Sequence, residues 1–122
     1  MTDEETSATL AAVDAFNAAF NAHDVDAVMA LMTDDCAFES TAPPDGGRFD
    51  GQEEVRAFWE EFFRLTPTAR FDGEEVIGAG DRCIVRWRYT WEEDGEQHHL
   101  RGVDVMRVRD GKLAEKFAYV KG

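Results

Sequence analysis

Asp104 is the residue whose setting in this sequence best suits chemistry. Residues 100–109 read LRGVDVMRVR, and Val103, Val105 and Val108 make this run typical of a buried strand. A carboxylate in apolar surroundings needs a charged or hydrogen-bonding partner, or it stays protonated and donates a hydrogen bond. Both states are useful for acid–base chemistry. Asp104 is therefore the central candidate for a catalytic acid or base, or for a donor that orients a ligand.

The hairpin after this strand decides whether Asp104 has a countercharge. Asp110-Gly111 between two strand-like runs predicts a tight turn. A three-residue turn over residues 109–111, with a glycine bulge, would place Lys116 inward and directly opposite Asp104. A two-residue turn would instead direct three other side chains of the last strand inward: Glu115, Phe117 and Tyr119. The first arrangement supplies a cation and the second fills the core better; we expect the first, with Lys116 as the partner of Asp104.

The preceding hairpin sets the face on which Asp104 lies. If Asp94-Gly95 is a two-residue turn, Val85 lies opposite Asp104 and Trp87 lies opposite Gly102. Asp104 then belongs to the inward, apolar face. A three-residue turn would reverse this, because a shift of one residue turns every side chain to the other face of the sheet.

Helices precede most of the strands. Apolar spacing predicts helices over residues 7–22 and 51–65, and a shorter helix that begins after the N-cap Asp24. Asp50 and Glu53 are the expected capping pair of the helix at 51–65. Residues 36–41 alternate as a strand does, and the proline- and glycine-rich residues 42–50 are expected to form a surface loop. Period-two alternation then predicts strands at about 69–78, 82–92, 97–109 and 112–120.

This order, ααβαββββ, predicts an α+β fold. Three N-terminal helices would pack on a strongly curved, mostly antiparallel sheet, forming a cone with one closed end. Residues 1–122 are expected to form a single domain, with residues 1–6 as a flexible tail. A cavity above the strand of Asp104 would be lined by ten further residues: Phe16, Phe20, Phe38, Ser40, Phe58, Trp59, Val85, Trp87, Tyr89 and Met106.

Composition excludes several classes of partner. The formal charge of −13, from 26 acidic and 13 basic residues, disfavours nucleic acid and anionic membranes. No apolar run is long enough for a membrane span, and the acidic start does not look like a signal peptide, so the cytoplasm is expected. Cys36 and Cys83 are expected to be free and buried. The three histidines show no metal-ligand spacing, and no metal or other cofactor is expected.

Three stretches together resemble a known family. They are FNAHDVDAVMALMTDDCAF at residues 20–38, Gly51-Gln52 opening an aromatic helix, and RVRDGKLAE at residues 107–115. Over residues 8–121 the chain resembles nuclear transport factor two-like proteins, most of all the SnoaL-like and ketosteroid-isomerase-like group. The resemblance implies the cone fold but no single reaction, because this scaffold carries many functions. It also implies a homodimer, which we expect to form through the outer sheet face.

Catalytic residues of these relatives are only partly kept. Ketosteroid isomerases use an aspartate base with a tyrosine and a protonated aspartic acid as hydrogen-bond donors. By resemblance, the tyrosine position falls at Phe16, the base at Ser40 and the donor at Asp104. SnoaL-type cyclases often carry His and Asp in the last strand, where this chain has EKFA at residues 115–118. Steroid isomerisation by the family mechanism is therefore not expected.

Three functions remain open. The first is a cofactor-independent isomerase, dehydratase or cyclase that moves protons on an apolar, oxygenated small molecule. The second is a non-catalytic binding protein for such a molecule. The third is a structural dimer whose cone is filled by its own aromatic side chains. A partly polar cavity of about 300 Å³ or more would support the first two.

Overall fold

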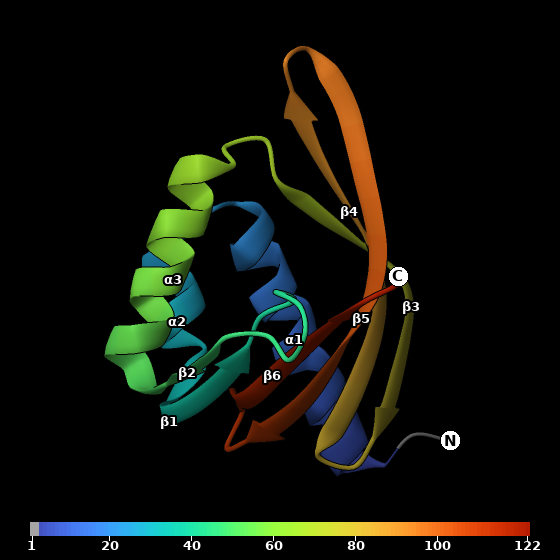
Figure 1. Ribbon diagram of the computed structural model, residues 1–122. Helices are drawn as coiled ribbons and strands as arrows, with labels where there is room; N and C mark the ends of the chain where they lie inside the picture. Colours follow the sequence, from blue (N-terminus) through green and yellow to red (C-terminus); the bar gives the residue numbers. More distant parts are fainter. Residues whose placement is uncertain (1–2) are drawn as a thin grey trace.

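The computed structural model describes residues 3–122 as an α+β fold with three helices on one side of a curved, six-stranded sheet (Figure 1). The helices are α1 (Glu4–Asn21), α2 (Val25–Ala30) and α3 (Gly51–Leu65). The strands are β1 (Met32–Glu39), β2 (Arg48–Asp50), β3 (Arg70–Ala79), β4 (Arg82–Glu93), β5 (Glu96–Arg109) and β6 (Lys112–Val120).

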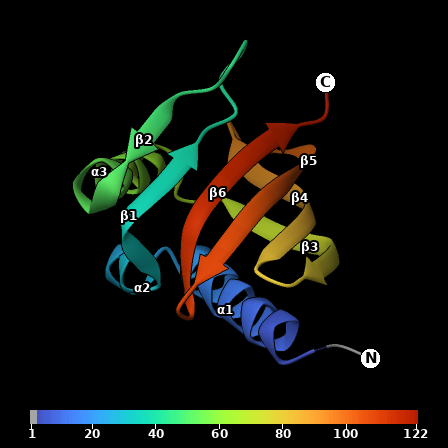
Figure 2. The ribbon, with the colours of Figure 1, turned by 90° about the horizontal axis from the view of Figure 1, so that it is seen from below.

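The sheet is almost entirely antiparallel, as predicted. Its strand order is β2-β1-β6-β5-β4-β3, which can be followed across Figure 2, and only β1 and β6 pair in parallel. Apolar side chains from α1, α3 and the inward face of the sheet form one continuous core. The predicted class and the three helices are therefore confirmed.

Helix α1 begins earlier than its apolar spacing indicates. Asp3 is the N-cap, and its Oδ1 accepts a hydrogen bond of 2.6 Å from the Thr6 N–H. That bond lowers the pKa of the Asp3 carboxyl. Glu4 and Glu5 lie in the first turn, where acidic side chains favour a helix. The predicted tail is thus wrong for residues 3–6, and residues 1–2 lie outside the described part of the chain.

The two later helices begin as expected, but one cap differs. Asp24 caps α2 by accepting from the Ala27 N–H at 3.1 Å. The predicted pair of Asp50 and Glu53 is wrong, because the Asp50 carboxylate makes no capping bond and pairs with Arg48 instead. Glu54 replaces Glu53, its Oε1 accepting from the Asp50 N–H at 3.0 Å.

A short strand replaces the end of the predicted loop at 42–50. Strand β2 pairs antiparallel with β1 and places Phe49 beside Phe38. The element order is therefore ααββαββββ, and the prediction lacked one strand. A strand of three residues is too short to show an alternating pattern in the sequence. It forms because β1 has an unpaired edge with which it can hydrogen-bond, and because the Phe49 ring packs 4.9 Å from the ring of Phe58.

The β4–β5 hairpin has the predicted register. Asp94 and Gly95 form its two-residue turn with positive φ angles of 53° and 79°, the backbone that such turns require. Val85 consequently lies opposite Asp104, and Trp87 lies opposite Gly102. Asp104 is on the inward face.

The β5–β6 hairpin combines parts of both predicted alternatives. Its turn has two residues, Asp110 and Gly111, so the predicted three-residue turn is wrong. A bulge follows, because Val108 pairs with Leu113 whereas Arg107 pairs with Glu115, which leaves one extra residue, Ala114, in β6. The extra residue turns Lys116 inward again.

The bulge also corrects the position of Lys116 relative to Asp104. Ala118 lies directly opposite Asp104, and Lys116 lies opposite Met106. Lys116 is therefore inward as predicted, but it is a diagonal neighbour of Asp104. Long side chains reach such diagonal neighbours on one face of a sheet.

The two cysteines are free and fully buried, as expected. Burial raises the pKa of both the Cys36 and the Cys83 thiol, and the charge of Asp104 raises that of Cys83 further. Within residues 3–122, no helix combines the length and the apolar character needed to cross a membrane.

Candidate functional site

A buried ion pair between β5 and β6 forms the centre of the candidate site. Lys116 Nζ lies 3.3 Å from Asp104 Oδ2, and the side chains of Lys116 and Asp104 are only 8% and 6% exposed. Removing two charges from water is costly, and an opposite charge at this distance offsets part of that cost. Each residue is therefore the principal electrostatic partner of the other.

Aromatic rings from three elements surround the Lys116 ammonium. Its Nζ lies 5.3 Å from the ring centroid of Phe38, 5.4 Å from Trp59 and 5.8 Å from Phe20. The faces of such rings attract cations, most strongly where water is excluded. Strand β1, helix α3 and helix α1 thus hold the charged end of Lys116 next to Asp104.

Three buried polar atoms of this region have no hydrogen-bond partner among the described residues. They are Asp104 Oδ1, Trp59 Nε1 and Trp87 Nε1. Buried polar groups are nearly always paired, and an unpaired one costs about 1–3 kcal/mol. Polar groups of a bound ligand would supply the partners that these atoms lack.

The largest opening beside the ion pair is a side cavity between α1 and β3, with a volume of about 320 Å³. Asp104 and Lys116 form part of its wall, together with four of the predicted lining residues: Phe16, Phe20, Val85 and Trp87. The sequence prediction missed eight others: Asp14, Asn17, Ala18, Asn21, Phe71, Asp72, Gly73 and Val76. Four of these have polar side chains and lie on α1 or β3. The apolar spacing of α1 predicts which of its side chains are buried, but it does not predict that its polar side chains line a cavity.

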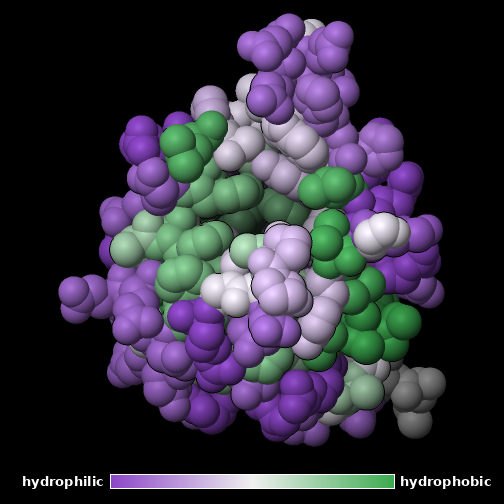
Figure 3. All heavy atoms as spheres, in the orientation of Figure 1, coloured by the Kyte–Doolittle hydropathy of each residue, from purple (hydrophilic) through white to green (hydrophobic). Residues whose placement is uncertain are grey.

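A second opening, the mouth cavity, lies between α3 and the ends of β5 and β6. Its volume is about 100 Å³, and Figure 3 shows an apolar hollow on this face of the molecule. Nine of its lining residues were named from the sequence: Phe20, Phe38, Ser40, Phe58, Trp59, Trp87, Tyr89, Asp104 and Lys116. Six others were missed: Thr41, Phe62, Phe71, Leu100, Ala118 and Val120. Burial raises the pKa of Tyr89, so its hydroxyl keeps its proton at neutral pH.

The two cavities share the ion pair as part of their walls. Both are lined by Asp104 and Lys116, and by three aromatic residues: Phe20, Phe71 and Trp87. The side cavity reaches the size of a small-molecule site, whereas the mouth cavity alone does not. A ligand at the ion pair would therefore occupy the side cavity.

Two predicted residues have other roles. Met106, expected at the cavity, lines neither opening and is a fully buried core residue between Cys83 and Lys116 on the neighbouring strands. Ser40 lines the mouth cavity, but its Oγ accepts from the Gly47 N–H at 2.9 Å. The Ser40 hydroxyl thus anchors the loop between β1 and β2.

The arrangement supplies acid–base groups rather than metal ligands. Within residues 3–122, no three or more histidine, cysteine, aspartate or glutamate side chains are grouped so that they could hold a metal ion. The residues in the walls of the two cavities include one carboxylate with an unpaired oxygen, one ammonium and, at the mouth cavity, two tryptophans with unpaired indole N–H groups. Such groups can move a proton and stabilise the charge that develops.

Comparisons with known proteins agree with this architecture. Residues 13–116 match the family described as the SnoaL-like domain. A nuclear transport factor two-like protein of unknown function from Mesorhizobium loti is 38% identical, with 100% of this chain and 98% of that one covered and a TM-score of 0.85. No curated protein sequence matches the chain.

More distant structures share the fold alone. A candidate SnoaL-like polyketide cyclase from Jannaschia is 18% identical, with 99% of this chain and 90% of that one covered and a TM-score of 0.86. A candidate ketosteroid isomerase from Kribbella flavida is 19% identical, with coverages of 97% and 81% and a TM-score of 0.81. The family match spans most of the chain, including α2, α3, β1 to β5 and both residues of the buried ion pair. The chain therefore belongs to the SnoaL-like domain family and has the nuclear transport factor two-like fold.

Proposed function

We propose that this protein binds an apolar, oxygenated small molecule and catalyses a proton transfer on it without a cofactor. The observation that carries the proposal is the unpaired Oδ1 of the buried Asp104, held beside a cavity of about 320 Å³ by Lys116. Isomerisation, dehydration and aldol-type cyclisation of a ketone all begin with removal of a proton from carbon. The candidate cyclase and the candidate isomerase that share the fold support this class of reaction.

Asp104 and Lys116 have complementary roles in the proposed step. The ionised Asp104 carboxylate takes a proton from the carbon next to the ligand carbonyl. Negative charge then moves to the carbonyl oxygen, and the Lys116 ammonium stabilises it. The aromatic walls exclude water, which strengthens this electrostatic stabilisation. The indole N–H of Trp87, which lines the same cavity, has no partner and is available to another ligand oxygen.

Binding without catalysis is the second candidate. Phe16 has no hydroxyl at the position of the isomerase tyrosine, and the Ser40 hydroxyl is committed to the loop of Gly47. In this case Asp104 would only orient the ligand. A cone filled by its own side chains receives less support, because the side cavity remains open.

Native mass spectrometry on gently purified protein tests the proposal, followed by denaturing extraction of any small molecule that is bound. We expect a discrete apolar, oxygenated molecule. Incubating it with the protein in heavy water should exchange its acidic C–H protons, and Asp104→Asn should abolish that exchange. Asp72→Asn is the matched control, since Asp72 lines the same cavity but pairs with Arg70.

Two results would contradict the proposal. Binding without proton exchange would favour the second candidate. A protein that carries no molecule, and whose melting temperature no member of a panel of cyclic and aromatic ketones raises, would contradict both candidates.

We also propose that the outer sheet face binds a second copy of the chain. Four apolar residues lie side by side across β3, β4, β5 and β6 on this face, and we call them the apolar row: Ile77, Ile84, Val105 and Phe117. Ile77 is 49% exposed and Ile84 is 39% exposed, although both are large and apolar. An exposed apolar patch with a polar rim is typical of a protein interface.

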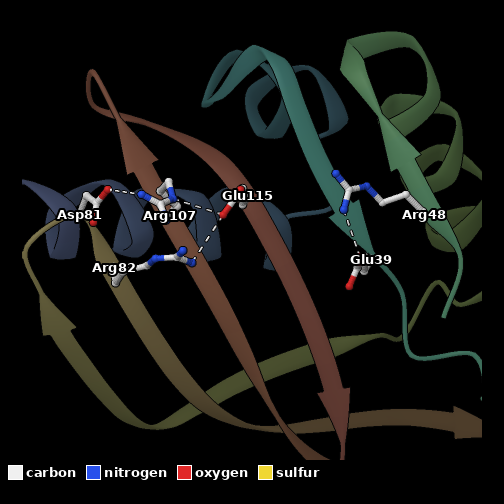
Figure 4. A network of polar contacts seen from close by, with 6 residues as sticks. All are labelled: Glu39, Arg48, Asp81, Arg82, Arg107 and Glu115. Carbon is white, nitrogen blue, oxygen red and sulfur yellow. Dashed lines mark hydrogen bonds and ion pairs between the residues drawn. The ribbon is translucent and has the colours of Figure 1, made fainter. Parts of the chain in front are cut away.

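Charged side chains of both signs form the rim of the apolar row. Arg82, Arg107 and Glu115 form one network together with Asp81, and Arg48 pairs with Glu39 farther along (Figure 4). A surface that carries both signs can match itself across a twofold axis. Together with the free cysteines, which suit a reducing compartment, these features fit a cytoplasmic homodimer.

Sedimentation equilibrium provides the measurement for this contact. The wild-type chain should be a dimer, and Ile84→Glu should produce monomers because it places a charge in the middle of the apolar row. Leu65→Glu is the control, since Leu65 is 64% exposed at the end of α3 and should leave the dimer intact. A wild-type monomer at every accessible concentration would contradict this interface.

A further inference from the structure

Lys116 differs from the other lysines of this chain. The sequence has three: Lys112, Lys116 and Lys121. Lys112 and Lys121 are exposed, whereas Lys116 is 7% exposed and lines both cavities. A lysine placed in an apolar pocket is a common choice for covalent chemistry with carbonyl compounds. We propose that Lys116 is a nucleophile that forms a Schiff base with an aldehyde or ketone in the side cavity.

This inference rests on the proposed function for its cavity and adds a substrate class and a covalent step. In it, an iminium on Lys116 takes the place of the Lys116 ammonium and the carbonyl oxygen as the group that accepts the developing charge. The surroundings of Lys116 meet three requirements of such a step. The first is room for the substrate, since Lys116 lines a cavity large enough for an aromatic carbonyl compound. Aromatic walls keep bulk water away. An acid–base group, Asp104, lies 3.3 Å away.

Asp104 can carry the protons that the reaction moves. Transfer of one proton from Nζ to Oδ2 converts the ion pair into a neutral amine and a neutral acid. The amine lone pair forms a bond to the carbonyl carbon, the C=O π electrons move to oxygen, and the Nζ proton passes to that oxygen to give a neutral carbinolamine. Asp104 then protonates the hydroxyl, the C–O bond breaks and water leaves. The products are a cationic iminium on Lys116 and an ionised Asp104.

The iminium preserves the charges of the site. A cation remains at Nζ and an anion at Asp104, so the buried pair is as well balanced after the step as before it. The step needs neither an oxidant nor a reductant, because one water leaves for each C=N bond formed. The iminium also withdraws electrons from the neighbouring carbon, from which the Asp104 carboxylate can then remove a proton.

Reductive trapping tests the inference. The folded protein is incubated with benzaldehyde and sodium cyanoborohydride, and peptide mapping then locates the benzyl adducts. We expect Lys116 to be labelled before Lys112 and Lys121 although it is buried. In urea the three lysines should label alike, which shows that each peptide is detectable. Lys116→Arg should lose the early adduct, and Lys112→Arg should retain it, with circular dichroism confirming that both variants are folded.

Each outcome has one meaning for the inference. Early labelling at Lys116 supports it, and slower labelling when benzyl alcohol is added places the reaction in the cavity. Labelling confined to Lys112, Lys121 and the N-terminal amine overturns it, as does the absence of any adduct. Peptide mapping of the wild-type chain tests whether Lys116 forms the adduct, even if Lys116→Arg does not fold. If benzyl alcohol raises the melting temperature but Lys116 is not labelled, the covalent step fails and the proposed binding site stands.

Discussion

Asp104→Asn is expected to lower the free energy of unfolding by about 3–5 kcal/mol. The substitution keeps the size of the side chain but removes its charge, and it leaves the Lys116 ammonium buried among aromatic rings without a counterion. Cation–π attraction alone is worth roughly 0.5–2 kcal/mol, which is less than the loss of a buried partner. Urea denaturation followed by tryptophan fluorescence measures the change.

The double variant Asp104→Asn/Lys116→Met identifies the cause. Methionine replaces the lysine stem with an apolar side chain of similar length, so no buried charge remains. We expect the double variant to unfold within about 1 kcal/mol of the wild type, because replacing a buried ion pair by uncharged groups is often neutral. The matched control is Asp72→Asn, which removes an exposed carboxylate of the same cavity and should change stability by less than about 1 kcal/mol.

Two results would contradict this account. If Asp104→Asn were as stable as the wild type, Lys116 would not depend on the charge of Asp104. If the double variant were as unstable as Asp104→Asn, the loss would come from the asparagine itself. In either case the roles of base and cation in the proposed mechanism would have to be reassigned.

Gly102→Ala is expected to destabilise the protein by about 3 kcal/mol. A Cβ atom at this position would lie 2.3 Å from the Tyr119 carbonyl oxygen and 2.6 Å from two atoms of the Trp87 ring. The first contact is with backbone of β6, so it cannot be relieved by a rotamer change. The end of the β5–β6 ladder and the wall of both cavities would have to shift together. Thermal melting and the near-ultraviolet circular dichroism of Trp87 report the two effects.

Gly73→Ala is a matched control on the other flank of the same tryptophan. Gly73 lies opposite Trp87 in β3, as Gly102 does in β5. A Cβ at Gly73 would meet its nearest neighbour, Val85, at 3.6 Å, which is ordinary van der Waals contact. We expect a change below about 1 kcal/mol. Equal destabilisation by both substitutions would show that loss of glycine in the sheet, rather than the clash with Tyr119, is the cause.

Local sequence determined those parts of the fold that depend on neighbouring residues. Asp94-Gly95 adopts the positive φ angles of a two-residue turn, and the alternation of β4 and β5 then specifies a single register. Asp104 could be placed on the inward face for this reason. The aromatic stripe of α3 likewise predicted its buried side, because side chains at helical spacing share one face.

The bulge of β6 could not be predicted from the local sequence, because it depends on both neighbouring strands of the sheet. The turn at Asp110-Gly111 alone would direct Lys116 outward, and Ala114 reverses this by occupying one extra position. Strand β6 must pair with β5 on one side and β1 on the other, and the register with β1 places Lys116 beside Phe38. The local sequence of β6 does not show how its pairing with β5 and its pairing with β1 are satisfied together. The short strand β2 was missed for a similar reason, because it forms only by pairing with the edge of β1.

The sequence by itself determined that the chain has a curved sheet with helices on one face, that Asp104 points inward and that aromatic side chains surround it. Periodicity and turn chemistry carry that information because they act over a few residues. Only the tertiary structure decided that Lys116 reaches Asp104 diagonally, and that the larger opening lies between α1 and β3. Cavities are made where elements distant in sequence fail to fill the space between them, and their place depends on how those elements pack.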